Sequence, residues 1–324
     1  MRGGQGRGPE RPLAVVALGG HAFVRQGEAP SIEIHERCAA EISAVLVTLV
    51  ERGYDLVLTH GNGPQVGQLL LQTDLTRDEL PAMPLDVLVA DTQGWLGYVL
   101  QQALLNQLHQ PHAQRHVVTM ITQVLVDAHD PAFEHPSKPV GRFLTREAAE
   151  RQRDAHGWHI AEDAGRGWRR HVPSPRPHEV IQWRMIRDAA LQGHIVIAAG
   201  GGGIPVVRAT DGQLQGIEAV IDKDLTSSVL ATAIGAGLLV ILTDVPQVYV
   251  DYRQPSQRGL DAVTMQEAER LIAEGHFAAG SMGPKVEAID AFLRHGGRRG
   301  LITDPPTLAA ALEGRGGTHF VGRL

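Results

Sequence analysis

Short apolar segments that each end in a cluster of glycines constrain the fold of this chain most strongly. Residues 13–18 (LAVVAL) run into Gly19 and Gly20, residues 55–59 (DLVLT) precede the sequence HGNG, and residues 194–199 (HIVIAA) run into four glycines. Segments with helical periodicity lie between them. Apolar strands that alternate with helices are typical of a mostly parallel sheet covered on both faces. The pattern therefore predicts an α/β fold.

The other expected elements continue this alternation. Further strands are expected over residues 117–126, 238–243 and 300–303, the last of them closing the fold. Helices are expected over residues 33–52, 64–73, 93–109, 225–235, 264–274 and 284–295. Proline opens two of these helices, at the position where its missing N–H is not needed. Residues 1–12 are expected to form a flexible tail, and residues 127–177, rich in Pro, His, Arg and Gly, an inserted lid subdomain.

Composition excludes several classes of protein. A net charge of −6 argues against a general nucleic-acid surface, and 4% aromatic residues are too few for a base-stacking platform. The apolar runs fall short of the roughly 18 residues that a membrane helix needs, and residues 1–12 lack the apolar core of a secretory leader. A single cysteine, Cys38, excludes an internal disulfide and favours a cytoplasmic location. We therefore expect no nucleic-acid or membrane partner.

Three glycine-rich loops follow three of the expected strands. In parallel α/β sheets, ligands bind beyond the carboxyl ends of the strands. Glycines there let backbone N–H groups approach and surround an anion. The loops match neither the GxGxxG nor the GxxxxGK[ST] pattern, so a phosphate or carboxylate would be held by another route. The candidate binding residues are Gly19, Gly20, His21, Gly61, Asn62, Gly63, Gly201 and Gly202.

Lysine is rare among the cationic residues. Only three of the 30 Lys and Arg residues are lysines: Lys138, Lys223 and Lys285. A compact ammonium is not interchangeable with a planar guanidinium where space is tight. Lys223 lies between two aspartates, which indicates either an ammonium oriented for phosphate or a solvated charge cluster. Lys285 opens an expected helix, where the helix dipole attracts anions.

Two other patterns were weighed. Thr243 and Asp244 end an expected strand, so they indicate a nucleotide-side loop, with a turn or cap role for Asp244 as the alternative. The sixteen histidines show no metal-ligand spacing such as HExxH, and most of them are expected on the surface or in loops. The GxSxG motif of serine hydrolases is absent.

A family resemblance rests on long sequence segments that occur in the same order over nearly the whole chain. They include VALGGHAF, LTHGNGPQVGQLLLQ, HIVIAAGGGGIPVV, GIEAVIDKDL, ILTDV-VY and EGHFAAGSMGPKVEA. From residue 13 to the C-terminus, the chain resembles the carbamate kinases of the amino acid kinase superfamily. Leu18 stands where acetylglutamate kinases and aspartokinases carry a lysine before the glycines, which favours carbamate kinase over these relatives.

The resemblance implies a fold and a reaction. The fold is a three-layer αβα sandwich with about eight mainly parallel strands and a protruding lid. The kinase domain would span residues 13–324, with an acceptor-side lobe over 13–215 and a nucleotide-side lobe over 216–324. The reaction is ATP + carbamate = ADP + carbamoyl phosphate, running towards ATP in arginine or carbamoyl-phosphate catabolism. The resemblance also implies a homodimer.

The resemblance assigns roles to particular residues. Lys223 and Lys285 would grip the transferring phosphoryl group, Asp224 would organise them, and Lys138 would reach in from the lid. The nucleotide side would comprise Thr243, Asp244, Val248, Tyr249, Met282, Gly283 and Lys285. Mg²⁺ is expected on the phosphates, with no protein ligand assigned.

His21 departs from the family, which usually has asparagine there. Either the imidazole is a tolerated replacement that still donates one hydrogen bond, or the acceptor preference or the activity is altered. Two rival functions remain: a kinase for another small acid, or a non-catalytic sensor. Four retained charged residues argue against the sensor, and the missing dinucleotide fingerprint disfavours an oxidoreductase.

Overall fold

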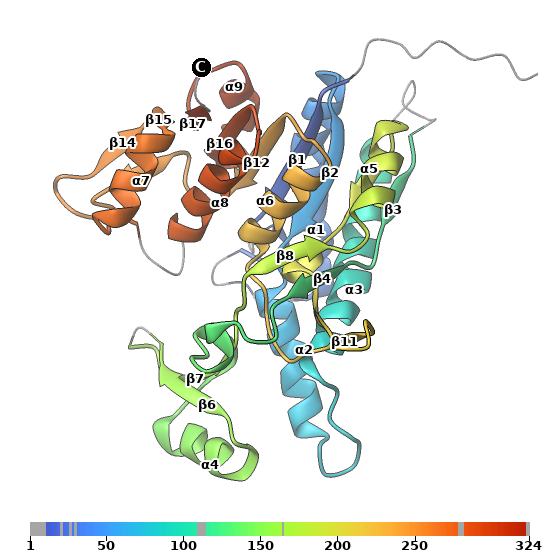
Figure 1. The fold of residues 1–324 in the computed structure, drawn as a ribbon, viewed down its shortest axis with the longest axis vertical. Helices are drawn as coiled ribbons and strands as arrows, with labels where there is room; N and C mark the ends of the chain where they lie inside the picture. The colour runs from blue at the N-terminus through green and yellow to red at the C-terminus, as the bar shows by residue number, and fades with distance from the viewer. Residues whose placement is uncertain are drawn as a thin grey trace, which may run out of the picture.

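An eight-stranded sheet forms the centre of the molecule (Figure 1). The structure is a computed structural model that describes residues 11–19, 22–25, 28, 31–108, 115–163, 165–277 and 282–321. Strands follow the order β15-β17-β16-β12-β1-β2-β9-β3. Only β16 and β17 pair antiparallel in this sheet. The bounds are β1 (Leu13–Leu18), β2 (Asp55–His60), β3 (Val117–Thr119), β9 (Ile195–Ile197), β12 (Leu238–Leu242), β15 (Ala262–Thr264), β16 (Arg299–Thr303) and β17 (Thr318–Val321).

Helices cover both faces of this sheet, as the side chains of β1 show. Val15 and Ala17 belong to one apolar core, and Val16 and Leu18 belong to a second core on the opposite face. The first core includes α5 (Trp183–Leu191), α6 (Lys223–Ala233), α7 (Met265–Ala273) and α8 (Met282–Arg294); the second includes α1 (Ile32–Glu51), α3 (Leu85–Gln107) and α9 (Leu308–Leu312). Because both faces are buried, the strands are continuously apolar. The predicted three-layer αβα fold is confirmed.

A second, four-stranded sheet has the order β11-β10-β4-β8. Its strands are β4 (Gln123–Val126), β8 (Pro177–Val180), β10 (Ile204–Arg208) and β11 (Leu214–Gly216), and a separate hairpin pairs β13 (Val248–Val250) with β14 (Arg258–Leu260). β10 directly follows the third glycine loop. β4 and β8 pair with each other, so the segment that joins them leaves this second sheet and returns to it.

That segment, residues 127–176, forms a small structure of its own. Its sheet has the order β5-β7-β6, from β5 (Lys138–Leu144), β7 (Trp168–Val172) and β6 (His159–Glu162), with α4 (Arg146–His156) beside it. Figure 1 shows it standing away from the main sheet, near α2 (Gly63–Leu75). Where α2 meets β5, a side chain at Gly67 would come within 3.2 Å of the Gly141 backbone. The insertion therefore packs closely on α2.

Three expectations differ from the structure by more than a shift of one or two residues at an element's end. Residues 117–126 form two strands in different sheets, β3 and β4. At the break between them, the Gln93 side chain bonds both the N–H and the C=O of Thr122, and that C=O also accepts the N–H of Ile204 in β10. The segment 300–303 is not the last strand, since β17 returns beside it. The helix expected from residue 93 begins at Leu85. Neither glycine nor proline marks the break within residues 117–126 in the sequence.

Candidate functional site

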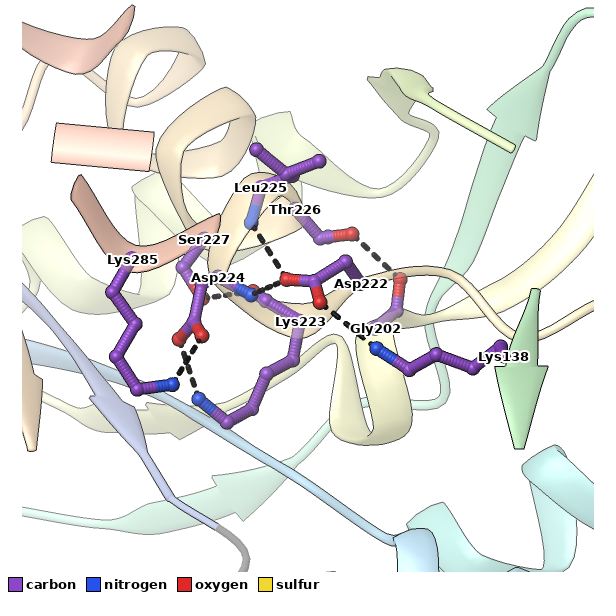
Figure 2. Close-up of polar contacts among 9 residues, drawn as sticks. All are labelled: Lys138, Gly202, Asp222, Lys223, Asp224, Leu225, Thr226, Ser227 and Lys285. Carbon is purple, nitrogen blue, oxygen red and sulfur yellow. Dashed lines mark hydrogen bonds and ion pairs between the residues drawn. The ribbon is translucent and has the colours of Figure 1, made fainter. Parts of the chain in front are cut away.

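Two lysines and one aspartate meet at the carboxyl edge of the main sheet (Figure 2). Lys223 opens α6 and Lys285 lies in the first turn of α8. These helices lead into β12 and β16, so their amino ends lie at the edge where the parallel strands end. Lys223 Nζ donates to Asp224 Oδ1 at 2.5 Å, and Lys285 Nζ donates to Asp224 Oδ2 at 2.8 Å. One buried carboxylate therefore holds two ammonium groups.

The charges of this triad leave an excess of one positive charge. Burial opposes ionisation of Asp224, but the ammonium groups of Lys223 and Lys285 outweigh it and lower the pKa of this carboxyl to about 2. Burial lowers the pKa of Lys223. Burial also acts most strongly on Lys285, but the charge and hydrogen bond of Asp224, with the nearby carboxylates, together outweigh it and raise the pKa of Lys285. Two helix amino ends add partial positive charge at the same place. The arrangement favours an anion such as a phosphoryl group.

The third lysine reaches the same helix end from the insertion. Lys138 is the first residue of β5, and its Nζ donates to Asp222 Oδ2 at 2.9 Å (Figure 2). Asp222 is also the N-cap of α6, because its Oδ1 accepts the N–H groups of Asp224 at 2.9 Å and Leu225 at 3.4 Å. All three lysines of the chain therefore meet the first turn of α6.

The glycine loops lie beside one another and beside α6. Gly61 N–H donates to the carbonyl of Leu18, which precedes Gly19, and Gly202 accepts a hydrogen bond from Thr226 on α6 at 2.8 Å. Gly201 takes a φ of +67°, and a side chain there would lie 2.2 Å from the Asn62 amide. The structure brings together the six described members of the predicted set: Gly19, Gly61, Asn62, Gly63, Gly201 and Gly202. Gly20 and His21 lie outside the described residues.

The expected nucleotide-side residues belong to three neighbouring segments. Thr243 and Asp244 follow β12, Val248 and Tyr249 open β13, and Met282 and Gly283 open α8. The charge of Asp244 helps to raise the pKa of Lys285, although burial is the largest single contribution and lowers this pKa. A cavity of about 410 Å³ is lined by Thr243 and Asp244 together with Gly19, but not by the other five residues of the expected nucleotide side, Lys285 included.

His60 was missed by the sequence analysis, which expected most histidines on the surface or in loops. It ends β2, is fully buried, and its Nδ1 donates to the Gly61 carbonyl at 3.0 Å. Nε2 is buried, finds no hydrogen-bond partner among the described residues, and lies against Gly200. Burial lowers the pKa of His60 to about 4. The only signal in the sequence was its position directly after the expected strand over residues 55–59.

Two residues of α3 were also missed. Thr92 Oγ1 accepts a hydrogen bond from the Asn62 amide at 2.8 Å, and the Gln93 amide donates to the Gly200 carbonyl at 3.0 Å. Both are buried. They fix the second and third glycine loops from one helix. The sequence analysis assigned no role to either residue.

No described helix is long and apolar enough to cross a membrane. The described residues also contain no group of three or more His, Cys, Asp or Glu side chains that could hold a metal ion.

Comparison with known proteins gives consistent matches. The sequence model of the amino acid kinase family matches residues 12–304. A carbamate kinase of Pyrococcus horikoshii is 45% identical over 313 residues, covering 96% of this chain and 99% of that one, and the carbamate kinase-like protein YahI of Escherichia coli is 44% identical over 314 residues. The structure of a Giardia lamblia carbamate kinase bound to AMP-PNP is similar at a TM-score of 0.90 and 39% identity, covering 97% and 99% of the two chains.

Proposed function

The chain belongs to the amino acid kinase family and is a phosphotransferase of the carbamate kinase type, and on that premise we propose that it transfers a phosphoryl group between ATP and carbamate. The observation that carries this proposal is the triad of Lys223, Asp224 and Lys285 at two helix amino ends. Phosphoryl transfer between two anions needs positioning and charge neutralisation more than covalent help. The triad offers both.

The direction we propose is ATP synthesis, as in the breakdown of arginine or of carbamoyl phosphate from another source. A terminal oxygen of ADP attacks the phosphorus of carbamoyl phosphate. A new P–O bond forms to ADP, and the P–O bond to carbamate breaks. Carbamoyl phosphate is a mixed anhydride, so this direction is chemically favourable. No proton has to move in this step, which fits a site whose described residues offer ammonium groups to the phosphoryl oxygens.

Each group at the site has a proposed role in this step. The ammonium groups of Lys223 and Lys285 stabilise the phosphoryl oxygens, and Asp224 holds both in position. Lys138 approaches from the insertion onto carbamoyl phosphate. Carbamate is small and offers few contacts, so N–H groups of the glycine loops, including those of Gly61 and Gly202, would orient it. His21 would belong to the same loop set.

We further propose that magnesium enters the site with the nucleotide. Mg²⁺ retains several water molecules and is commonly held by substrate phosphates with one or two carboxylates. The described residues contain no dedicated metal cluster, which fits this mode of binding. When bound, the ion would neutralise nucleotide phosphates. Thr243 and Asp244, with Val248, Tyr249, Met282 and Gly283, would contact the nucleotide.

We also propose a cytoplasmic homodimer. The single cysteine, Cys38, is buried and unpaired, as expected for a protein of a reducing compartment. Tyr98 and Leu105, seven residues apart on α3, are 59% and 46% exposed and offer an apolar face to a second copy. Light scattering tests this directly: a particle of one chain's mass at micromolar concentration would contradict it.

Formation of ATP from Mg-ADP and carbamoyl phosphate, read by luminescence, tests the proposed function. We expect rapid synthesis by the wild type and a loss of at least about a hundredfold in Lys223→Ala or Lys285→Ala, the scale of removing an electrostatic stabiliser. A folded wild type that binds nucleotide but forms no ATP above these variants would move the function to another acceptor or to a sensor.

A further inference from the structure

Asp222 makes two different contacts that the proposed chemistry has not yet used. Oδ1 caps α6, while Oδ2 accepts Lys138 Nζ at 2.9 Å (Figure 2). The Asp222 side chain is 16% exposed and the Lys138 side chain 36% exposed, so this ion pair is partly shielded from water. Shielding and a charged donor make such a bond stronger than an exposed surface pair. The carboxylate therefore has a binding function besides the cap.

The Lys138–Asp222 pair connects two separate parts of the molecule. Lys138 lies on the sheet of the insertion, and Asp222 lies 84 residues further along the chain at the start of α6. The insertion makes other contacts with the body, including Val220 N–H to the Pro173 carbonyl and the ion pair of Arg170 with Glu218 at 3.3 Å. Of these charged contacts, the Lys138–Asp222 pair is the one at the α6 end that holds the triad.

Asp222 fixes the position of the Lys138 ammonium before a substrate binds. A long lysine side chain on a small inserted sheet would otherwise sample many rotamers, and ordering it on substrate binding would cost free energy. Asp222 holds Lys138 Nζ at the start of α6. Asp222 is two positions before Asp224 in the sequence, so Nζ lies beside the phosphoryl-binding lysines. An arriving phosphoryl group then meets an ammonium that is already in place, which lowers the cost of binding.

We propose that Asp222 is a positioning residue that docks Lys138, and with it the insertion, at the phosphoryl-transfer site. Asp222 does not contact the reacting atoms and acts through Lys138. The inference rests on the proposed function for its kinetic consequence. Its structural consequence, an insertion held to the body by this pair, does not depend on the substrate.

The key variant is Asp222→Asn, because asparagine and aspartate are equally good N-caps while asparagine carries no charge for Lys138. Asp222→Ser, also a good cap, serves as a second variant. Glu218→Gln is the matched control, since it removes the charge of another ion pair of the insertion, away from the triad, while its amide oxygen can still accept the Leu85 N–H. Thermal unfolding should show all three folded, within a few degrees of the wild type.

The first measurement is the kinetics of ATP synthesis. We expect Asp222→Asn and Asp222→Ser to raise KM for carbamoyl phosphate about tenfold, the scale of one charge-assisted hydrogen bond. KM for Mg-ADP and kcat should stay within about twofold, and Glu218→Gln should match the wild type. In a Lys138→Met background, Asp222→Asn should have no further effect, because its partner is already gone.

The second measurement is hydrogen exchange without substrates. Amides of β5 and β7 should exchange faster in Asp222→Asn than in the wild type or in Glu218→Gln. Unchanged KM and exchange in both Asp222 variants would overturn the proposal and leave Asp222 as a cap only. A lowered KM would also overturn it, because Asp222 would then compete with substrate for Lys138. A wild type without ATP synthesis refutes the proposed function, whereas the exchange result still decides the docking.

Discussion

Replacing Asp224 by asparagine tests whether one carboxylate holds two cations at the site. The Asp224 side chain is 4% exposed, and its pKa falls from 3.8 to about 2. That shift corresponds to about 2 kcal/mol in favour of the ionised form. Removing one partner of a buried ion pair typically costs about 3–5 kcal/mol, because the remaining charge is uncompensated. Here Lys223 and Lys285 would be left facing each other.

We therefore expect Asp224→Asn to lower the free energy of unfolding by about 3 kcal/mol at pH 7 and the rate of ATP synthesis by at least about a hundredfold. The pH dependence has a defined sign. A carboxyl with a lowered folded pKa contributes stability above its unfolded pKa, and loses it as the pH falls through its folded pKa. The difference between wild type and variant should therefore shrink between about pH 4 and pH 2.

Urea unfolding with and without sodium sulfate is the assay. Sulfate is a dianion of phosphoryl size, so it should stabilise the variant more than the wild type by binding the two uncompensated ammonium groups. Asp188→Asn, an exposed carboxylate paired with Arg187 at 3.1 Å, is the matched control and should change stability by less than about 0.5 kcal/mol. Wild-type stability and full activity in Asp224→Asn would refute the reasoning.

Three further predictions concern the glycine loops and their support. Since the folded pKa of His60 lies near 4, below the usual 6.5, the wild type should lose up to about 3 kcal/mol of unfolding free energy as the pH falls from 6.5 to 4; urea titrations should show a flatter slope in His60→Asn, and an equal slope would contradict this. Gly201→Ala should destabilise by about 1–3 kcal/mol through the left-handed φ and the close Asn62 amide, more than Gly212→Ala, whose site is open. His21→Asn should leave turnover within about tenfold, since one hydrogen bond of about 1 kcal/mol changes; complete loss would show that this loop works differently from that of the family.

The main sheet was predictable from the sequence because its strands carry an unambiguous signal. β1 has the expected bounds, and β2 and β12 differ by one residue. Each is buried on both faces, and loop-forming residues follow it directly in the sequence. The composition of the strand and the signal for its end therefore agree. The segment 117–126 lacks such agreement. It contains neither glycine nor proline, and at the break Thr122 is bonded by Gln93 and Ile204, two residues distant in the sequence, which no local pattern reveals.

The candidate site was predictable to a similar extent. The glycines and the three lysines stand out because their residue type is unusual in its context. His60, Thr92 and Asp222 do not, since each is a common polar residue whose role depends on a partner from another segment. Thr92 is 30 residues from Asn62, and Asp222 is 84 residues from Lys138. Long-range hydrogen bonds of this kind become visible only when the fold is known.

The geometry at Asp224 also explains why a chain rich in arginine uses lysine here. A guanidinium presents a planar fork that bonds both oxygens of a carboxylate at once. One arginine would therefore occupy Asp224 completely. An ammonium takes a single oxygen, so Lys223 and Lys285 share the same carboxylate, one on each side. The two charges can then meet a phosphoryl group together, which a single bidentate arginine pair would not allow.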